Sequence, residues 1–147
     1  MKKKSLQLEQ FVPYKLSIAS NVVSDLIASS YQQKFHLSIP EWRLIAVLGE
    51  RGQATQQQLC AITLMDKVTV SRAARTLHKR KLISKKPNLD DKRSQYLFLD
   101  LKGRSLYKQV SPQAIQLEAA LLSNFKKNEI QHFLKMLNRL IDLSARV

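Results

Sequence analysis

The stretch that decides the fold spans residues 66–81 and reads DKVTVSRAARTLHKRK. At 100° per residue it forms a two-faced helix, with Asp66 as its N-cap. One face is small and apolar, as packing against a core requires. It consists of Val70, Ala73, Ala74 and Leu77. The opposite face is cationic and hydroxylated. It consists of Val68, Arg72, Arg75, Thr76 and Lys79, with Ser71 at its margin. This composition suits a DNA major groove, although a solvated basic surface has the same pattern.

Two more helices are predicted upstream. Residues 38–41, SIPE, form a capping box with proline in the first turn, and the helix they open is predicted to end near Gly52. Residues 55–58, TQQQ, repeat the capping box and open a short helix. Residues 63–65 then form a tight turn before the basic helix. Two short helices joined by a tight turn, the second cationic outward, indicate a helix-turn-helix.

A β-hairpin is predicted directly after the basic helix. Residues 82–87 and 95–99 have strand composition, and residues 88–93 have the Asn and Asp typical of turns. The tip of this hairpin ends in Lys92 and Arg93. Such a hairpin is a wing, and its tip cation would enter an adjoining minor groove, where narrow A·T segments deepen the negative potential.

The two ends of the chain are predicted to be helical. The first helix covers residues 14–31, and another runs from 101 to about 123, where Pro112 kinks or divides it. The apolar stripe of the first helix consists of Leu16, Ala19, Val22, Val23, Leu26 and Ile27. The stripe of the last helix consists of Ile130, Phe133, Leu134, Leu137, Leu140 and Ile141. A winged helix of roughly 70 residues cannot cover this much apolar surface, so we expect dimerisation to cover it.

Charge favours a polyanionic partner. The chain has 25 Lys or Arg against 11 Asp or Glu, a net charge of +14. Residues 67–93 alone hold ten Lys or Arg against two Asp. Nucleic acid is favoured over an anionic membrane, because the residues opposite the cations are mostly Ala and Val rather than bulky apolar groups. No apolar run has transmembrane length, no signal peptide follows the basic start, and the single Cys60 fits a reducing cytoplasm. We therefore expect a cytoplasmic protein.

Catalysis is not expected. The three histidines (His36, His78 and His132) lie in different predicted elements without metal-ligand spacing. No phosphate loop, dinucleotide fingerprint or nucleophile elbow occurs, so the sequence predicts no catalytic residue, no metal and no cofactor. Cys60 is interpreted as a small buried residue, with a redox switch as the alternative.

Four segments resemble the MarR family of bacterial transcriptional regulators. They are SIPEWR at residues 38–43, MDKVTVSR at 65–72, DKR at 91–93 and LDLKG at 99–103. The resemblance implies an obligate homodimer, a pseudo-palindromic operator and, usually, repression relieved by a small aromatic carboxylate or phenolic effector. It also implies that Arg72 enters the major groove and Arg93 the minor groove. Asp91 matches the family's wing aspartate and would hold Arg93 or Arg72 in position, unless it only forms the turn.

An effector pocket is predicted where the first two helices and the dimerisation region meet the DNA-binding module. Its candidate residues are Ser17, Asn21, His36, Trp42 and Arg43. Arg43 would pair with a carboxylate and Trp42 would stack on a ring. The alternatives are core packing for Trp42 and a structural salt bridge for Arg43. The small uncharged residues on one side of the first helix fit a partner helix, a ligand cavity or an ordinary surface.

The sequence therefore predicts a mostly α winged helix-turn-helix with a small β-hairpin wing and N- and C-terminal dimerisation helices. Residues 38–100 form the DNA-binding domain, and residues 1–37 and 101–147 form the dimerisation region. The predicted DNA-binding residues are Lys67, Val68, Thr69, Ser71, Arg72, Arg75, Thr76, Lys79, Lys92 and Arg93. The alternative function is a nonspecific or architectural nucleic-acid binder without an effector, in which the same cations contribute affinity alone.

Overall fold

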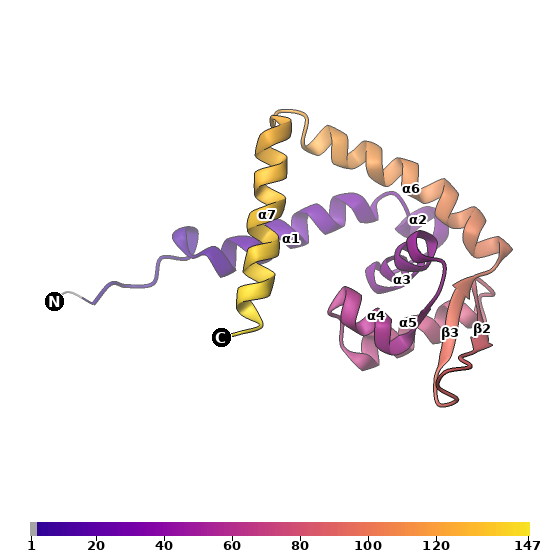
Figure 1. Cartoon of the computed structure of the whole chain (residues 1–147). Helices are drawn as coiled ribbons and strands as arrows, with labels where there is room; N and C mark the ends of the chain where they lie inside the picture. The colour runs from indigo at the N-terminus through magenta and orange to yellow at the C-terminus, as the bar shows by residue number, and fades with distance from the viewer. Residues whose placement is uncertain (1–2) are drawn as a thin grey trace. The chain divides into compact units, whose positions relative to one another are not determined.

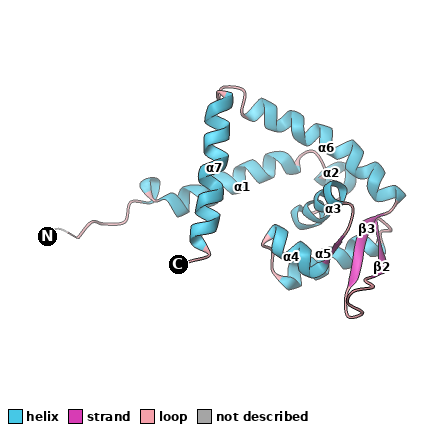
Figure 2. Cartoon of the chain, viewed as in Figure 1, coloured by secondary structure: helices cyan, strands magenta, loops and turns pink. Residues whose placement is uncertain are grey.

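The computed structural model describes residues 3–147, which are mostly helical with a small antiparallel sheet (Figures 1 and 2). The elements in chain order are η1 (Leu8–Gln10), α1 (Val12–Ala28), α2 (Gln32–Phe35), α3 (Ile39–Arg51), β1 (Ala54–Thr55), α4 (Gln56–Thr63), α5 (Lys67–Lys79), β2 (Ile83–Pro87), β3 (Gln95–Leu99), α6 (Leu101–Leu121) and α7 (Lys127–Ser144). The predicted winged helix fold is confirmed. The chain divides into two compact units, the first running to Ala114 and the second spanning Ile115–Val147.

Side-chain caps begin the three helices of the helix-turn-helix region as predicted. The backbone N–H of Ser38 donates to the Glu41 carboxylate over 3.0 Å, and the Glu41 N–H donates to the Ser38 hydroxyl over 3.3 Å. Thr55 and Gln58 make the same reciprocal pair over 2.9 and 3.1 Å. Asp66 accepts the backbone N–H of Thr69 over 2.7 Å. Each cap satisfies N–H groups that have no partner within the helix, which fixes where the helix starts.

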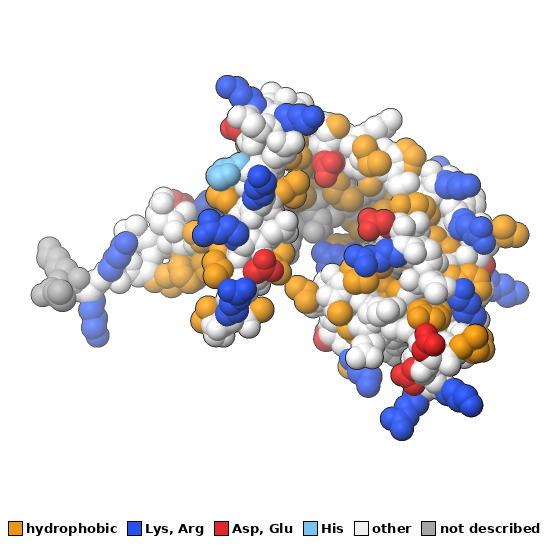
Figure 3. Space-filling model, viewed as in Figure 1, with side chains coloured by type: hydrophobic (Ala, Val, Ile, Leu, Met, Phe, Trp, Pro, Cys, Tyr) orange, Lys and Arg blue, Asp and Glu red, His pale blue; other side chains and the backbone are white. Residues whose placement is uncertain are grey.

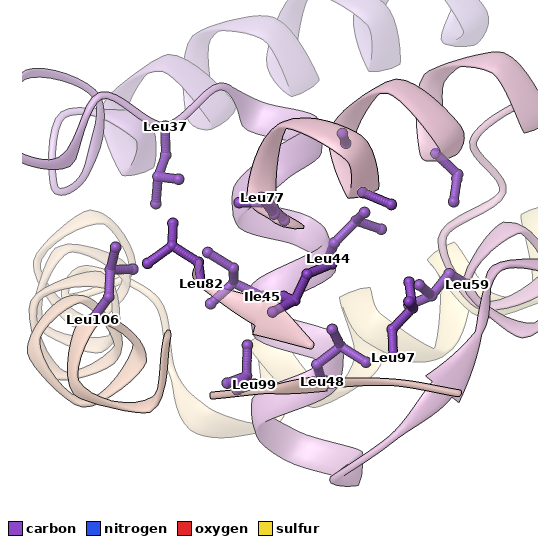
Figure 4. Packing of buried hydrophobic residues seen from close by; sticks show 14 of the residues in the cluster. Leu37, Leu44, Ile45, Leu48, Leu59, Leu77, Leu82, Leu97, Leu99 and Leu106 are labelled. Carbon is purple, nitrogen blue, oxygen red and sulfur yellow. The ribbon is translucent and has the colours of Figure 1, made fainter. Parts of the chain in front are cut away.

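The core of the first unit lies between α3, α4, α5 and the sheet (Figure 4). Leu44 and Leu48 of α3 meet Leu77 of α5 and Leu97 of β3 there, and all four are buried. The predicted inner face of α5 is buried along its whole length. It consists of Val70, Ala73, Ala74 and Leu77. Because this face is held against the core, the opposite face of α5 must point outward.

The sheet has the order β1-β3-β2 and is antiparallel throughout. Strand β2 pairs with β3 from Ile83 opposite Leu99 to Pro87 opposite Gln95. The two-residue strand β1 was not predicted from sequence. It pairs Ala54 with Leu97, and its second residue, Thr55, is also the N-cap of α4. The wing is therefore anchored to the start of the helix-turn-helix.

Two predictions about the terminal helices are wrong in detail. The first helix ends at Ala28 rather than continuing to residue 31, because Ala28 and Tyr31 are both buried and the chain turns between α1 and α2 to place them. In α1 the predicted apolar stripe is largely exposed, and only Ile27 of that stripe packs against the core of this chain. Helix α6 continues through Pro112 to Leu121, so of the two outcomes expected at this proline, a kink or a division, the division does not occur.

Two glycines allow the first turns of α6 to pack closely against neighbouring segments of the first unit. A Cβ on Gly103 would overlap the backbone carbonyl oxygen of Leu82. A Cβ on Gly49 of α3 would lie 2.6 Å from the ring of Tyr107. Both positions therefore require glycine for close approach rather than for an unusual backbone angle. No helix within residues 3–147 has both the length and the apolar character needed to span a membrane.

Candidate nucleic-acid interface

The outer face of α5 carries exposed cations. Lys67, Arg72, Arg75 and Lys79 are all exposed, together with Thr76, and Val68 is 58% exposed among them. Ser71 is half-buried at the margin of this face. Thr69 is half-buried as well, and its hydroxyl donates to the Asp66 carboxylate over 2.9 Å. The structure therefore presents most of the predicted α5 residues on one surface, while Thr69 belongs mainly to the helix cap.

The cations of this face are not neutralised by acids of the same chain. Within residues 3–147 the only Lys or Arg within 4.0 Å of a carboxylate is Arg51, which lies 3.9 Å from its neighbour Glu50. Arg72 and Arg75 thus have guanidinium groups available for an external acceptor. Five N–H donors in a planar fork match phosphate or a guanine edge.

Asp66 holds the start of this helix, and its charge is favoured by the fold. The backbone N–H of Thr69 donates to its carboxylate and lowers the pKa of Asp66 below its usual value, with the Thr69 hydroxyl adding to the effect. An ionised Asp66 also complements the positive end of the α5 dipole. The carboxylate therefore fixes the end of α5 that carries Lys67 and Val68.

The wing tip is ordered by side-chain to backbone hydrogen bonds. Asn88 accepts the N–H of Asp90 over 3.1 Å, and its amide donates to the Ser94 hydroxyl over 3.1 Å. Asp91 accepts the N–H of Arg93 over 3.0 Å. This bond supports the turn-forming interpretation of Asp91, and no ion pair joins it to Arg72 or Arg93 in the described part of the chain. Lys92 and Arg93 are both exposed at the tip.

Lys and Arg side chains also gather on the part of the first unit that carries the wing (Figure 3). Lys85 and Lys86 of β2 are exposed in addition to the tip residues. The wing and α5 follow one another in the chain and are joined through the core by Leu77 and Leu97. The cationic surface therefore spans two rigidly connected elements, which is the arrangement needed to contact two neighbouring grooves.

Arg80 joins α5 to a distant segment, and this contact was not predicted from sequence. Its guanidinium donates to the backbone carbonyls of Phe35 and His36 over 2.7 and 3.0 Å. These contacts join the C-terminal end of α5 to the junction between α2 and α3. In the sequence Arg80 lies between Lys79 and Lys81, and no feature of this basic run distinguishes it from its neighbours. Only the fold brings together residues 44 positions apart.

The five candidate effector residues do not form one cluster. Trp42 stacks on Tyr31, with ring centroids 5.3 Å apart, and on Tyr107, 6.2 Å apart. It packs against the core, in agreement with the packing interpretation. Burial raises the pKa of Tyr31, although the charge of Arg43 acts in the opposite direction.

The remaining candidate effector residues are exposed. They are Ser17, Asn21, His36 and Arg43. The structural salt bridge considered for Arg43 is absent among residues 3–147. The stacking of Trp42 on Tyr31 and Tyr107 could not be predicted from sequence, because the three rings come from different segments of the chain. Cys60 packs against the core as predicted, but it is half-buried rather than buried.

Comparison with known proteins gives one family match and several similar structures. Residues 37–94 match the model of the MarR family. The chain is similar to a crystal structure of a MarR/EmrR family transcriptional regulator from Acinetobacter sp. ADP1, with a TM-score of 0.88, 27% identity, and coverage of 97% of this chain and 100% of that one.

Two further structures share the fold at lower identity. One is a Listeria monocytogenes regulator assigned to the MarR family and complexed with 26mer DNA, with a TM-score of 0.83, 22% identity and coverage of 98% and 91%. The other is NadR in complex with 4-hydroxyphenylacetate, with a TM-score of 0.81, 18% identity and coverage of 95% and 97%. The winged helix-turn-helix segment of this chain is therefore similar to the MarR family of transcriptional regulators, and the likeness of fold to a regulator of that family extends over nearly the whole chain.

Proposed function

We propose that the protein binds a pseudo-palindromic operator as a homodimer and represses transcription until a small aromatic or phenolic acid releases it. The observation that carries the DNA part of this proposal is the exposed face of α5, whose arginines have no acidic partner among the described residues. Arg72 and Arg75 would contact bases, with Val68, Ser71 and Thr76 beside them. Lys67 and Lys79 would contact phosphates, and Arg93 would enter the minor groove with Lys92 at its edge.

Uncovered apolar surface supports the homodimer. In α7, Phe133, Leu134 and Ile141 are each more than half exposed, although they form the apolar stripe of an amphipathic helix. In α1, Leu16, Val22 and Leu26 are also exposed. A monomer with this much apolar surface would associate. A two-fold dimer would also present two copies of α5, which suits two half-sites about one helical turn apart.

The effector part of the proposal draws on the aromatic stack and the neighbouring cation. Trp42 offers a ring between Tyr31 and Tyr107, and Arg43 follows it in the chain with an exposed guanidinium. The NadR structure contains 4-hydroxyphenylacetate in a protein of the same fold. We propose that Arg43 pairs with the carboxylate of such an acid while its ring lies near Trp42.

Footprinting of the promoter adjacent to the protein's own gene tests the DNA proposal. The expected result is protection of one inverted repeat, and an unselective footprint would favour the nonspecific binder instead. Arg72→Ala should weaken binding to the repeat by about 1–3 kcal/mol while leaving random duplex less affected. Equal losses on both duplexes would contradict base contact by Arg72.

Two separate measurements test the dimer and the effector. Phe133→Asp should convert a dimer to a monomer in light scattering after size-exclusion chromatography, because it places a charge on the apolar stripe. Addition of 4-hydroxyphenylacetate should raise the melting temperature and release the operator, whereas the neutral 4-hydroxyphenylacetamide should do neither. Arg43→Gln should remove the response to the acid without changing ligand-free operator affinity.

A further inference from the structure

One cavity of the first unit is lined neither by α5 nor by Trp42. It has a volume of about 420 Å³ and is bounded by the C-terminal part of α3, the wing strands and the first turns of α6. This volume is within the range of small-molecule sites, about 300–1,000 Å³. In addition to Leu99, three apolar or aromatic side chains and three cations line it. They are Leu48, Phe98, Tyr107, Lys86, Arg104 and Lys108.

The apolar part of this cavity is held in place by its surroundings. Leu48 is buried in the core, and Phe98 and Tyr107 are half-buried. The Tyr107 ring is fixed by its stack on Trp42, 6.2 Å away between centroids. The Lys86 ammonium lies 5.5 Å from the centroid of the Phe98 ring, so a cation and an aromatic surface occur together at one wall. These walls suit a flat apolar group.

No acidic side chain balances the three cations of the cavity. No Asp or Glu is among its lining residues, and Arg104 and Lys108 are like charges four positions apart on α6, an unfavourable spacing on a helix. The C-terminal end of α3 contributes a negative dipole of roughly half a charge, which three full positive charges exceed. A bound monoanion would leave most of this charge uncompensated, whereas a dianion would compensate about two of the three charges.

We propose that this cavity binds an organic phosphate, namely a phosphate monoester attached to a flat apolar group. The Arg104 fork and the two ammonium groups would hold the phosphate, since guanidinium binds phosphate through paired N–H donors and ammonium binds it as a point charge. Leu48, Phe98 and Tyr107 would cover the apolar group. The site shares no residue with the DNA-contacting face of α5 or with the proposed effector residues Trp42 and Arg43.

Isothermal titration of the full chain with 1-naphthyl phosphate tests this assignment. Its two halves, inorganic phosphate and 1-naphthol, are titrated separately. We expect the monoester to bind at least tenfold more tightly than either half. The double variant Arg104→Gln/Lys108→Gln should weaken its binding at least tenfold. The matched control is Lys135→Gln/Arg139→Gln, which removes the same charge at the same spacing from exposed positions on α7 and should bind the monoester like wild type.

Three results would overturn the proposal. They are absence of monoester binding to wild type, equal affinity for inorganic phosphate, and equal weakening in the cavity variant and its control, which would indicate a diffuse charge effect. Melting curves establish that each variant is folded. If the double variant does not fold, Lys86→Gln replaces it, because Lys86 is an exposed cation that lines the cavity from β2 rather than from α6. Unchanged affinity in that folded variant would equally refute the site.

Discussion

Removing the Arg80 guanidinium should lower stability by about 2–3 kcal/mol. Arg80→Met keeps most of the aliphatic side chain and deletes both hydrogen bonds to the carbonyls of Phe35 and His36. The 2.7 Å bond to Phe35 is partly buried, and a hydrogen bond to a charged group there contributes about 1.5–2 kcal/mol. The 3.0 Å bond to His36 is at the surface, where water can replace the donor, and contributes about 0.5–1 kcal/mol.

Thermal unfolding measured by circular dichroism checks this value. For a chain of this size the loss corresponds to a melting temperature about 5–10 °C lower. Lys81→Gln is the matched control, because it removes the adjacent exposed charge and should change stability by less than about 0.5 kcal/mol. Protein concentration must be equal in all samples, since association contributes to stability. If Arg80→Met melts within about 1 °C of the control, the contacts of Arg80 do not stabilise the position of α5.

Three further predictions concern the packing of α6, the cap of α5 and the phosphate contacts. Gly103→Ala should lower the free energy of unfolding, measured in urea, by about 3 kcal/mol or more. The added Cβ would overlap the backbone carbonyl of Leu82, which cannot move without the rest of the backbone. A loss below about 1 kcal/mol would contradict this packing. Because the folded-state pKa of Asp66 is lowered, its stabilising contribution is present at neutral pH and is lost as pH falls below the usual Asp pKa of about 3.9, so wild type should lose more stability on acidification than Asp66→Asn. Parallel pH profiles would rule out the carboxylate as the source. Lys79→Ala should weaken specific and random DNA alike and reduce the slope of log affinity against log salt by about 1, and a loss confined to the operator would assign Lys79 to a base instead.

The parts of the fold that could be predicted from sequence are those determined by neighbouring residues. Ser38 with Glu41, and Thr55 with Gln58, are three positions apart, so their reciprocal caps are visible as a spacing. The two faces of α5 follow from its helical period in the same way. The site residues of α5 and the wing tip were identifiable because charge and turn chemistry are local properties.

The features that were missed depend on contacts between distant segments. Strand β1 has two residues and exists because β3 returns beside it, so it has no period to detect. Arg80 acts on a carbonyl 44 positions away. The apolar stripe of α1 was recognised, but a periodic pattern shows only that one face is apolar and not which molecule covers it. Most side chains of that stripe are exposed and do not pack against the core of this chain.

The position of α5 links these local and distant effects. Its inner face fixes the rotation of the helix, because exchanging the two faces would bury Arg72 and Arg75 without partners at a cost of several kcal/mol per charge. Asp66 caps the first turn of the helix through its bond from Thr69, and Arg80 joins the other end to the carbonyl of Phe35 in α2. The helix can therefore meet DNA with its side chains already oriented, and less conformational freedom is lost on binding. Arg80→Met should consequently weaken operator binding, although Arg80 is outside the proposed DNA-contacting set. If the variant loses stability but keeps its operator affinity, this end of α5 does not need to be fixed for binding.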